Sequence, residues 1–172
     1  MSFRTLLVPL VGLGLMTVGG AHTTPSRPAG AGGIGPYRLA WPLRAWVLTQ
    51  PYGCTTMELE PVADWCPTGH FHSGVDLAAP AGTPVHAAGT GVARVAESPD
   101  GYGLYVVIDH GGGMATLYGH LDWTPLSNGE AVHAGDELGL VGSSGLSTGP
   151  HLHFEVRRNG RPVDPTPWLP AA

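Results

Sequence analysis

Large apolar residues recur from about position 39 in short runs that are separated by Gly, Pro, Asn and Asp. Such runs favour β-strands joined by tight turns, and nothing in this part shows the 3.6-residue repeat of an amphipathic helix. The expected strands cover residues 45–50, 85–88, 91–97, 104–110, 114–120, 131–133, 137–141 and 151–157. The pattern predicts an all-β fold, an antiparallel β-sandwich or barrel-like scaffold.

The first 21 residues have the pattern of a secretion signal: Arg4 supplies a positive charge, residues 6–18 are apolar, and Gly19-Gly20-Ala21 suits signal peptidase. The apolar run is short for a transmembrane span, and an uncleaved membrane anchor is the alternative. Residues 22–38 are rich in small and turn-forming residues and are expected to be a short linker, leaving one domain over 39–172. We expect a secreted protein, located in the periplasm or cell envelope.

Composition and charge narrow the class of protein. A chain of 172 residues can form one domain with its own core. Its 27 Gly and 17 Pro follow no collagen-like period and suit a turn-rich β protein. The net charge is −5, and all eight basic residues are Arg without clustering into a patch. These features argue against nucleic acid as a partner.

Two cysteines, Cys54 and Cys66, lie in the segment 51–71, where we expect a loop without strands. In an exported protein an even cysteine count suggests a disulfide, whereas zinc ligation by both thiols is the alternative. A loop of this length is often functional, so 51–71 is expected to form one wall of a cleft, with a surface excursion as the alternative.

The most informative stretch is His151-Leu152-His153, within a run of strand-forming residues. On a strand, residues two apart share a face, and their Cβ atoms lie roughly 6–7 Å apart. One metal site can therefore use both histidines, one as ligand and the other as a base or polarising group. Spacing alone does not decide which of the two binds the metal.

A second cluster, His72 and Asp76, is four positions apart with Gly74 between them. A straight strand would separate the pair by about 13 Å, but glycine allows a sharp bend that could bring both onto one ion. Two histidines, a carboxylate and an open position are typical of catalytic zinc. His120 is then a candidate for the proton-transferring group, as is whichever of the paired histidines is free.

Three motifs together resemble the lysostaphin/LytM-type zinc metallopeptidases, peptidase family M23. They occur in the family's order and span much of the region 46–165: His72-Ser73-Gly74-Val75-Asp76, Tyr118-Gly119-His120-Leu121 and Gly149-Pro150-His151-Leu152-His153-Phe154-Glu155. The resemblance implies that His72, Asp76 and His153 bind one Zn²⁺, and that His120 and His151 are the catalytic histidines.

The resemblance further implies an active zinc endopeptidase that cuts stem or cross-bridge peptides of bacterial peptidoglycan. Its site would lie in a groove floored by strands and walled by the loops 51–71, 122–129 and 142–150. We expect a monomer with no membrane partner once the signal is removed. The alternatives are a catalytically silent regulator or wall-binding module on the same fold, and a phosphotransfer-type β domain, against which Asp76 and the signal both argue.

The remaining polar candidates receive simpler interpretations. His70 could approach the metal, although a structural role is favoured. His110 is expected to make a structural hydrogen bond at a strand end. Glu155 shares a face with the paired histidines, and could either support a ligand histidine or form a salt bridge with a nearby Arg.

Overall fold

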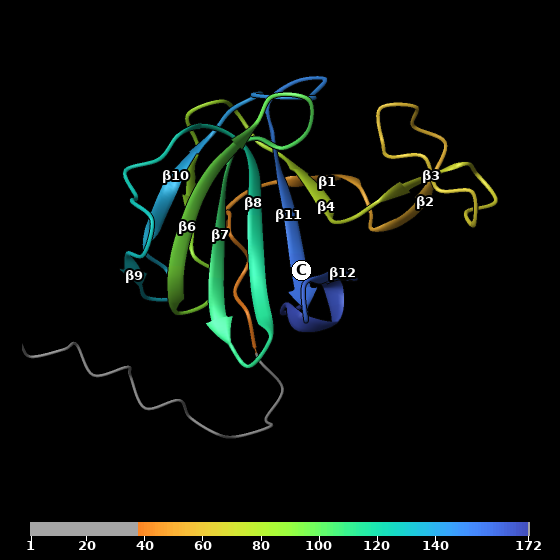
Figure 1. The fold of residues 1–172 in the computed structure, drawn as a ribbon. Coiled ribbons are helices and arrows are strands. Elements are labelled where there is room, and N and C mark those ends of the chain that lie inside the picture. The colour runs from red at the N-terminus through yellow and green to blue at the C-terminus, as the bar shows by residue number, and fades with distance from the viewer. Residues whose placement is uncertain (1–37, 172) are drawn as a thin grey trace, which may run out of the picture. The chain divides into compact units, whose positions relative to one another are not determined.

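The computed structural model describes residues 38–171, which are almost entirely β with one short 3-10 helix (Figure 1). The elements are β1 (Val47–Gln50), β2 (Gly53–Thr55), β3 (His70–His72), β4 (Val75–Ala78), β5 (Pro84–His86), β6 (Gly91–Ser98), β7 (Gly103–Gly111), β8 (Met114–Trp123), β9 (Ala131–Val132), β10 (Glu137–Val141), β11 (His151–Arg158), β12 (Arg161–Val163) and η1 (Thr166–Trp168). Across residues 38–171, no helix has the length and hydropathy for a membrane crossing. The predicted signal, 1–21, and residues 22–37 of the predicted linker lie outside the described residues.

Ten strands form one sheet, and β2 pairs with β3 in a second, smaller one. The main path runs β1-β4-β11-β8-β7-β6-β9, while β10 pairs with β8 and β5, and β12 pairs with β11. All of these pairings are antiparallel. Because β8 has three partners, the sheet branches there instead of continuing flat. The prediction of an all-β antiparallel scaffold is confirmed.

Strand β11 separates the core from the opposite face of the sheet. Leu152, Phe154 and Val156 are fully buried in the apolar core, and the alternation of a strand places His151 and His153 on the other face. Burying each large apolar side chain contributes about 1.5–3 kcal/mol. A one-residue slip would expose that apolar set, so the core fixes the face on which the histidines lie.

The expectation of a strandless loop over 51–71 is wrong, since β2 and β3 pair there with Cys54 opposite Phe71. Each strand has three residues and shows no apolar alternation, which leaves no signal in the sequence. The structure also contains strands β4 and β12, which the sequence pattern does not predict. The turn at Asn159-Gly160, with φ of 50° and 78°, folds β12 back on β11.

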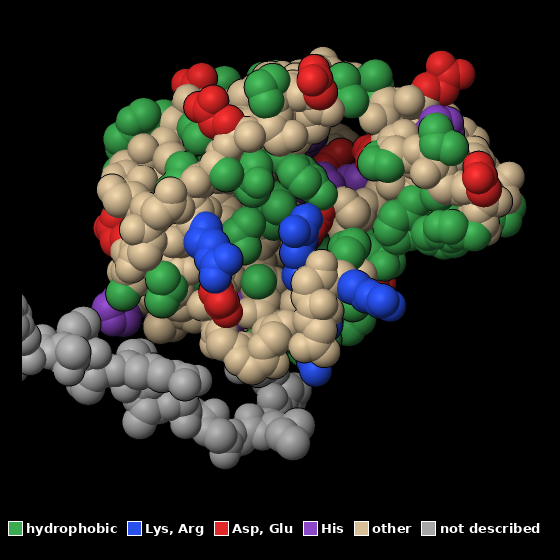
Figure 2. Space-filling view, viewed as in Figure 1, with side chains coloured by type: hydrophobic (Ala, Val, Ile, Leu, Met, Phe, Trp, Pro, Cys, Tyr) green, Lys and Arg blue, Asp and Glu red, His purple; other side chains and the backbone are tan. Residues whose placement is uncertain are grey.

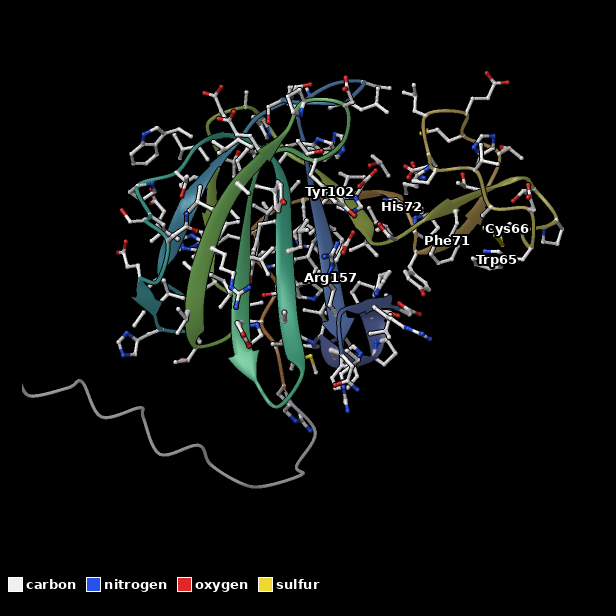
Figure 3. The ribbon with its side chains drawn as sticks, viewed as in Figure 1. Trp65, Cys66, Phe71, His72, Tyr102 and Arg157 are labelled. Carbon is white, nitrogen blue, oxygen red and sulfur yellow. A yellow bond between two sulfur atoms is a disulfide. The ribbon has the colours of Figure 1, made fainter. Side chains whose placement is uncertain are left out.

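Residues 53–72 form a projection that we call the disulfide arm, seen at the right of Figure 1. Cys54 and Cys66 form a disulfide, which excludes them as zinc ligands in this state. Within the arm, the Trp65 ring packs against Phe71 with centroids 4.8 Å apart (Figure 3). The base of the arm is β3, which ends at His72 and so connects the arm directly to the candidate site.

Candidate metal centre

Three side chains that are distant in sequence converge on one point. His72 Nε2 lies 3.2 Å from Asp76 Oδ1 and 3.0 Å from His153 Nδ1, and the last two atoms are 3.0 Å apart. All three residues are buried. Three potential ligand atoms this close together form a candidate metal site, and they belong to the residues that the sequence motifs single out.

The local backbone explains this convergence. Strand β3 ends at His72 and β4 begins at Val75, so the chain bends at Gly74 as expected. A Cβ at Gly74 would lie 2.4 Å from the Phe154 carbonyl oxygen, so glycine permits β4 to approach β11 closely. In the resulting register Asp76 stands directly opposite His153.

Hydrogen bonds orient the two imidazoles toward the common point. His72 Nδ1 lies 2.9 Å from the Pro51 carbonyl oxygen, so Nδ1 carries the proton and Nε2 is free to bind a metal. His153 Nε2 lies 3.1 Å from Glu155 Oε1, which leaves Nδ1 as the free nitrogen. Such outer partners are typical of metal-binding histidines.

The donor set fits zinc. With bonds of about 2.0–2.1 Å, tetrahedral zinc separates its ligand atoms by roughly 3.3 Å. The three observed separations, 3.0–3.2 Å, are close to this value. Two imidazole nitrogens and one carboxylate oxygen leave a fourth position open, as in catalytic zinc sites. His72, Asp76 and His153 could therefore hold one zinc ion.

The electrostatics of the trio favour binding of a cation. Burial opposes the charge on Asp76, but its contacts with the imidazoles of His153 and His72 outweigh burial and hold the pKa of Asp76 well below its ordinary value. Burial likewise opposes a charge on His153, yet hydrogen bonds to Asp76 and Glu155 raise its pKa to about 9. Without a metal, a proton on His153 compensates the two carboxylates, and a metal ion can replace this proton.

His120 and His151 lie beside the trio, with ring centroids 4.7 Å apart. Their Nδ1 atoms lie 2.8 Å from the Ser144 carbonyl oxygen and 2.7 Å from that of Gly149, respectively. In each ring Nδ1 therefore carries the proton and Nε2 is an acceptor. His151 Nε2 lies 3.7 Å from Asp76 Oδ2, next to the candidate metal position.

His120 is held in an unusual conformation. Its φ is 61°, in the left-handed region, which costs a residue with a side chain about 1–2 kcal/mol. The His120 N–H donates to the Tyr102 carbonyl oxygen at 2.7 Å and compensates part of this cost. Burial lowers the pKa of His120 to about 4, so the imidazole is neutral near pH 7. Strained residues of this kind gather at functional sites.

Glu155 is completely buried beneath His153 and accepts several hydrogen bonds. Ser73 Oγ and the Tyr102 hydroxyl donate to Oε1 at 2.6 and 2.7 Å, and Arg157 Nε donates to Oε2. Burial opposes its charge, but His153 and Arg157 lower the pKa of Glu155 to about 2. Glu155 thus has both of the roles considered from sequence, support of a histidine and a salt bridge.

A groove of about 730 Å³ lies over the centre, and Figure 2 shows red and purple side chains recessed between the arm and the body. Its walls come from the arm (Met57 to Val62) and from residues 146–150, as expected. The predicted wall at 122–129 is wrong, because residues 98–102 line the groove instead. These residues include Tyr102, which the motifs do not reveal because it contacts the site across a loop.

His70 and His110 make hydrogen bonds with atoms outside the trio. His70 Nδ1 bonds the Glu60 carbonyl oxygen at 2.7 Å. His110 contacts the Thr90 carbonyl oxygen at 2.8 Å and Thr116 Oγ1 at 2.9 Å, which is the structural hydrogen bond expected of it.

Fold and site together define an antiparallel β protein with a candidate metal centre of two histidines and one aspartate. Residues 70–165 match the sequence profile of peptidase family M23, and the chain belongs to this family. M23 peptidases are zinc metallopeptidases, in agreement with the donor set described above.

Three relatives illustrate the relationship. The DD-carboxypeptidase/endopeptidase Mpg of Neisseria meningitidis serogroup B is 49% identical over 98 residues, 57% of this chain and 23% of Mpg. The murein hydrolase activator EnvC of Escherichia coli is 39% identical over 140 residues, 80% of this chain and 31% of EnvC. The chain thus spans about a quarter to a third of the length of these relatives. The catalytic domain of the prophage-encoded M23 protein EnpA from Enterococcus faecalis matches with a TM-score of 0.63 and 36% identity, covering 77% of this chain and 97% of that domain.

Proposed function

We propose that this protein is an exported zinc endopeptidase that hydrolyses peptide bonds in bacterial peptidoglycan. The observation that carries the proposal is the convergence of His72, Asp76 and His153 within 3.0–3.2 Å, with His120 and His151 beside them at the floor of a groove. Similarity to Mpg, a DD-carboxypeptidase/endopeptidase, supports peptidase activity, and similarity to the murein hydrolase activator EnvC supports peptidoglycan as the target.

In this proposal His72 Nε2, Asp76 Oδ1 and His153 Nδ1 hold the zinc ion. Bound zinc would supply a Lewis acid that polarises a peptide carbonyl and makes a neighbouring water more acidic. The walls from the arm and from residues 146–150 would hold the peptide chain across the centre. The protein then has to transfer protons and stabilise developing negative charge.

His120 and His151 are suited to this task. Each imidazole keeps its Nδ1 proton on a main-chain carbonyl oxygen and presents a free Nε2. The Nε2 of one ring can accept a proton from the attacking water and later deliver it to the departing amine. While it carries that proton, the same nitrogen is a charged donor for the oxyanion. The lowered pKa of His120 keeps its imidazole neutral near pH 7.

A second candidate function is activation of other wall hydrolases without catalysis. It is favoured by the similarity to EnvC, which extends over 80% of this chain. The presence of all five site residues favours the enzyme instead. An activator would neither cleave peptidoglycan alone nor need zinc.

Digestion of purified peptidoglycan tests the proposal. Zinc-loaded wild-type protein should release soluble peptides whose new termini, identified by mass spectrometry, arise from hydrolysis of a peptide bond. The His151→Ala variant serves as a matched control and should release these peptides at least about 100-fold more slowly. Intact peptidoglycan after treatment with zinc-loaded wild-type protein would refute the proposed enzymatic function and leave activation of other hydrolases as the candidate function.

A further inference from the structure

Tyr102 joins the wall of the groove to the metal centre. It precedes β7 at the end of the turn 98–102 and lines the groove. Its ring centroid lies 5.3 Å from that of His153. Its hydroxyl donates to Glu155 Oε1 at 2.7 Å, and the same carboxylate oxygen accepts from His153 Nε2 at 3.1 Å. One oxygen atom therefore connects the tyrosine to a candidate zinc ligand.

The hydroxyl of Tyr102 has a defined place in the charge network. Arg157 Nη2 donates to it at 3.2 Å (Figure 3 labels both residues). Arg157 Nε donates to Glu155 Oε2. The tyrosine therefore accepts from the cation and donates to the anion. Because Glu155 has no exposed surface, water cannot stabilise its negative charge, and these hydrogen-bond donors must do so. Removing one donor therefore leaves the carboxylate less firmly held.

The turn that carries Tyr102 is itself anchored. The Tyr102 carbonyl oxygen accepts the His120 N–H at 2.7 Å, and Ser144 Oγ accepts the Leu104 N–H at 3.0 Å. The turn also packs tightly on the loop 142–150: a Cβ added to Gly103 would lie 2.2 Å from Ser144 Oγ. Because its backbone is fixed on two sides, the tyrosine can fix the carboxylate in turn.

We propose that Tyr102 is a positioning residue, whose hydroxyl holds the Glu155 carboxylate so that His153 presents Nδ1 to the metal. This inference rests on the proposed zinc site, but not on the identity of the bond that is cut. The alternative is that the Tyr102 ring only fills space beside His153. Substitution by phenylalanine separates the two roles, because it keeps the ring and the main-chain carbonyl and removes only the hydroxyl.

The test compares the zinc affinity of the full-length wild type with that of Tyr102→Phe, Glu155→Gln and the double variant, by competition with a chelator. Loss of groups that orient metal ligands typically weakens metal affinity about 10- to 100-fold. We expect Glu155→Gln to show a loss in this range and Tyr102→Phe a loss of about 10-fold. Because both act through one carboxylate, Tyr102→Phe should add little in the Glu155→Gln background.

Tyr105→Phe is the matched control. Its ring lies 5.5 Å from that of Tyr102, and its hydroxyl makes no hydrogen bond within residues 38–171. It should bind zinc like the wild type. Visible absorption of the Co²⁺-substituted proteins gives an independent readout, since a displaced imidazole shifts the ligand-field bands of Tyr102→Phe and not those of Tyr105→Phe. The melting temperatures of the zinc-free variants verify that they are folded.

Unchanged zinc affinity and an unchanged Co²⁺ spectrum in folded Tyr102→Phe would overturn the positioning role. Losses that multiply in the double variant would also overturn it, because they would show that the two residues act separately. A wild type that binds no zinc would overturn both this inference and the proposed function. A wild type that binds zinc but leaves peptidoglycan intact would refute only the proposed function.

Discussion

Asp76 on β4 stands directly opposite His153 on β11, and its Oδ1 lies 3.0 Å from His153 Nδ1. The pairing register of two antiparallel strands thus sets the distance between two candidate zinc ligands. That register is fixed from the other face of β11, where Leu152 and Phe154 are fully buried. Packing of the core and assembly of the metal centre are therefore coupled through one strand.

Gly74→Ala tests this coupling. The added Cβ would meet the Phe154 carbonyl oxygen at 2.4 Å, together with Glu155 and His153 side-chain atoms at 3.0 Å. Strand β4 must then move away from β11, with a cost of about 1–3 kcal/mol in the free energy of unfolding. Urea unfolding should show this loss, and zinc titration should show weaker binding. Wild-type values in both measurements would contradict the role assigned to this close approach.

The disulfide arm supplies a second prediction. Replacing both Cys54 and Cys66 by alanine removes a crosslink that closes a 12-residue separation. The chain-entropy model gives a loss of about 3 kcal/mol in the free energy of unfolding, measured by urea denaturation. Dithiothreitol should produce a similar loss in the wild type and no further change in the double variant. A wild type insensitive to the reductant would show that the crosslink contributes little.

The lowered pKa of His110, which lies outside the metal centre, predicts that the free energy of unfolding depends on pH. Burial lowers its pKa below the ordinary value of about 6.5. At a pH between the lower pKa of the folded state and the ordinary pKa of the unfolded state, the unfolded chain binds more protons at His110 than the folded protein does. Stability contributed by the neutral imidazole is therefore present above about pH 6.5 and is lost as the pH falls toward the lower folded pKa.

His110→Gln measures this contribution. The variant loses the ionisable group, so its unfolding free energy should fall less steeply between pH 7 and 5, by up to about 1.4 kcal/mol per pH unit. Urea unfolding at several pH values, with wild type and variant in parallel, gives the two slopes. Equal slopes would show that His110 titrates alike in the folded and unfolded chain.

The period-two pattern of β11 predicts which residues share a face, and the structure confirms it. The same pattern cannot distinguish His151 from His153, since both lie on that face. Contacts across the sheet distinguish them: His153 Nδ1 meets Asp76 and its Nε2 meets Glu155, whereas His151 Nδ1 meets the Gly149 carbonyl oxygen. Only the resemblance to M23 peptidases supplies this assignment at the level of sequence.

Other features have no local signal in the sequence. Strands β2 and β3 have three residues each. They are stabilised by their pairing with one another and by the Cys54–Cys66 disulfide. Tyr102 reaches Glu155 across 53 positions, so no motif joins them. The groove wall at 98–102 follows from the packing of two loops around Gly103 and Ser144, which strand patterns do not describe.

Zinc stoichiometry with matched activity in wild type, His153→Ala and His151→Ala tests the central claim most directly. In the proposed site His153 contributes a ligand atom, whereas His151 Nε2, 3.7 Å from Asp76 Oδ2, would be free for proton transfer. Wild type should bind one zinc ion per chain and cleave peptidoglycan, and His153→Ala should lose both properties. His151→Ala should keep its zinc and lose activity about 10²- to 10⁴-fold. Full zinc content in His153→Ala, or full activity in either variant, would contradict the account.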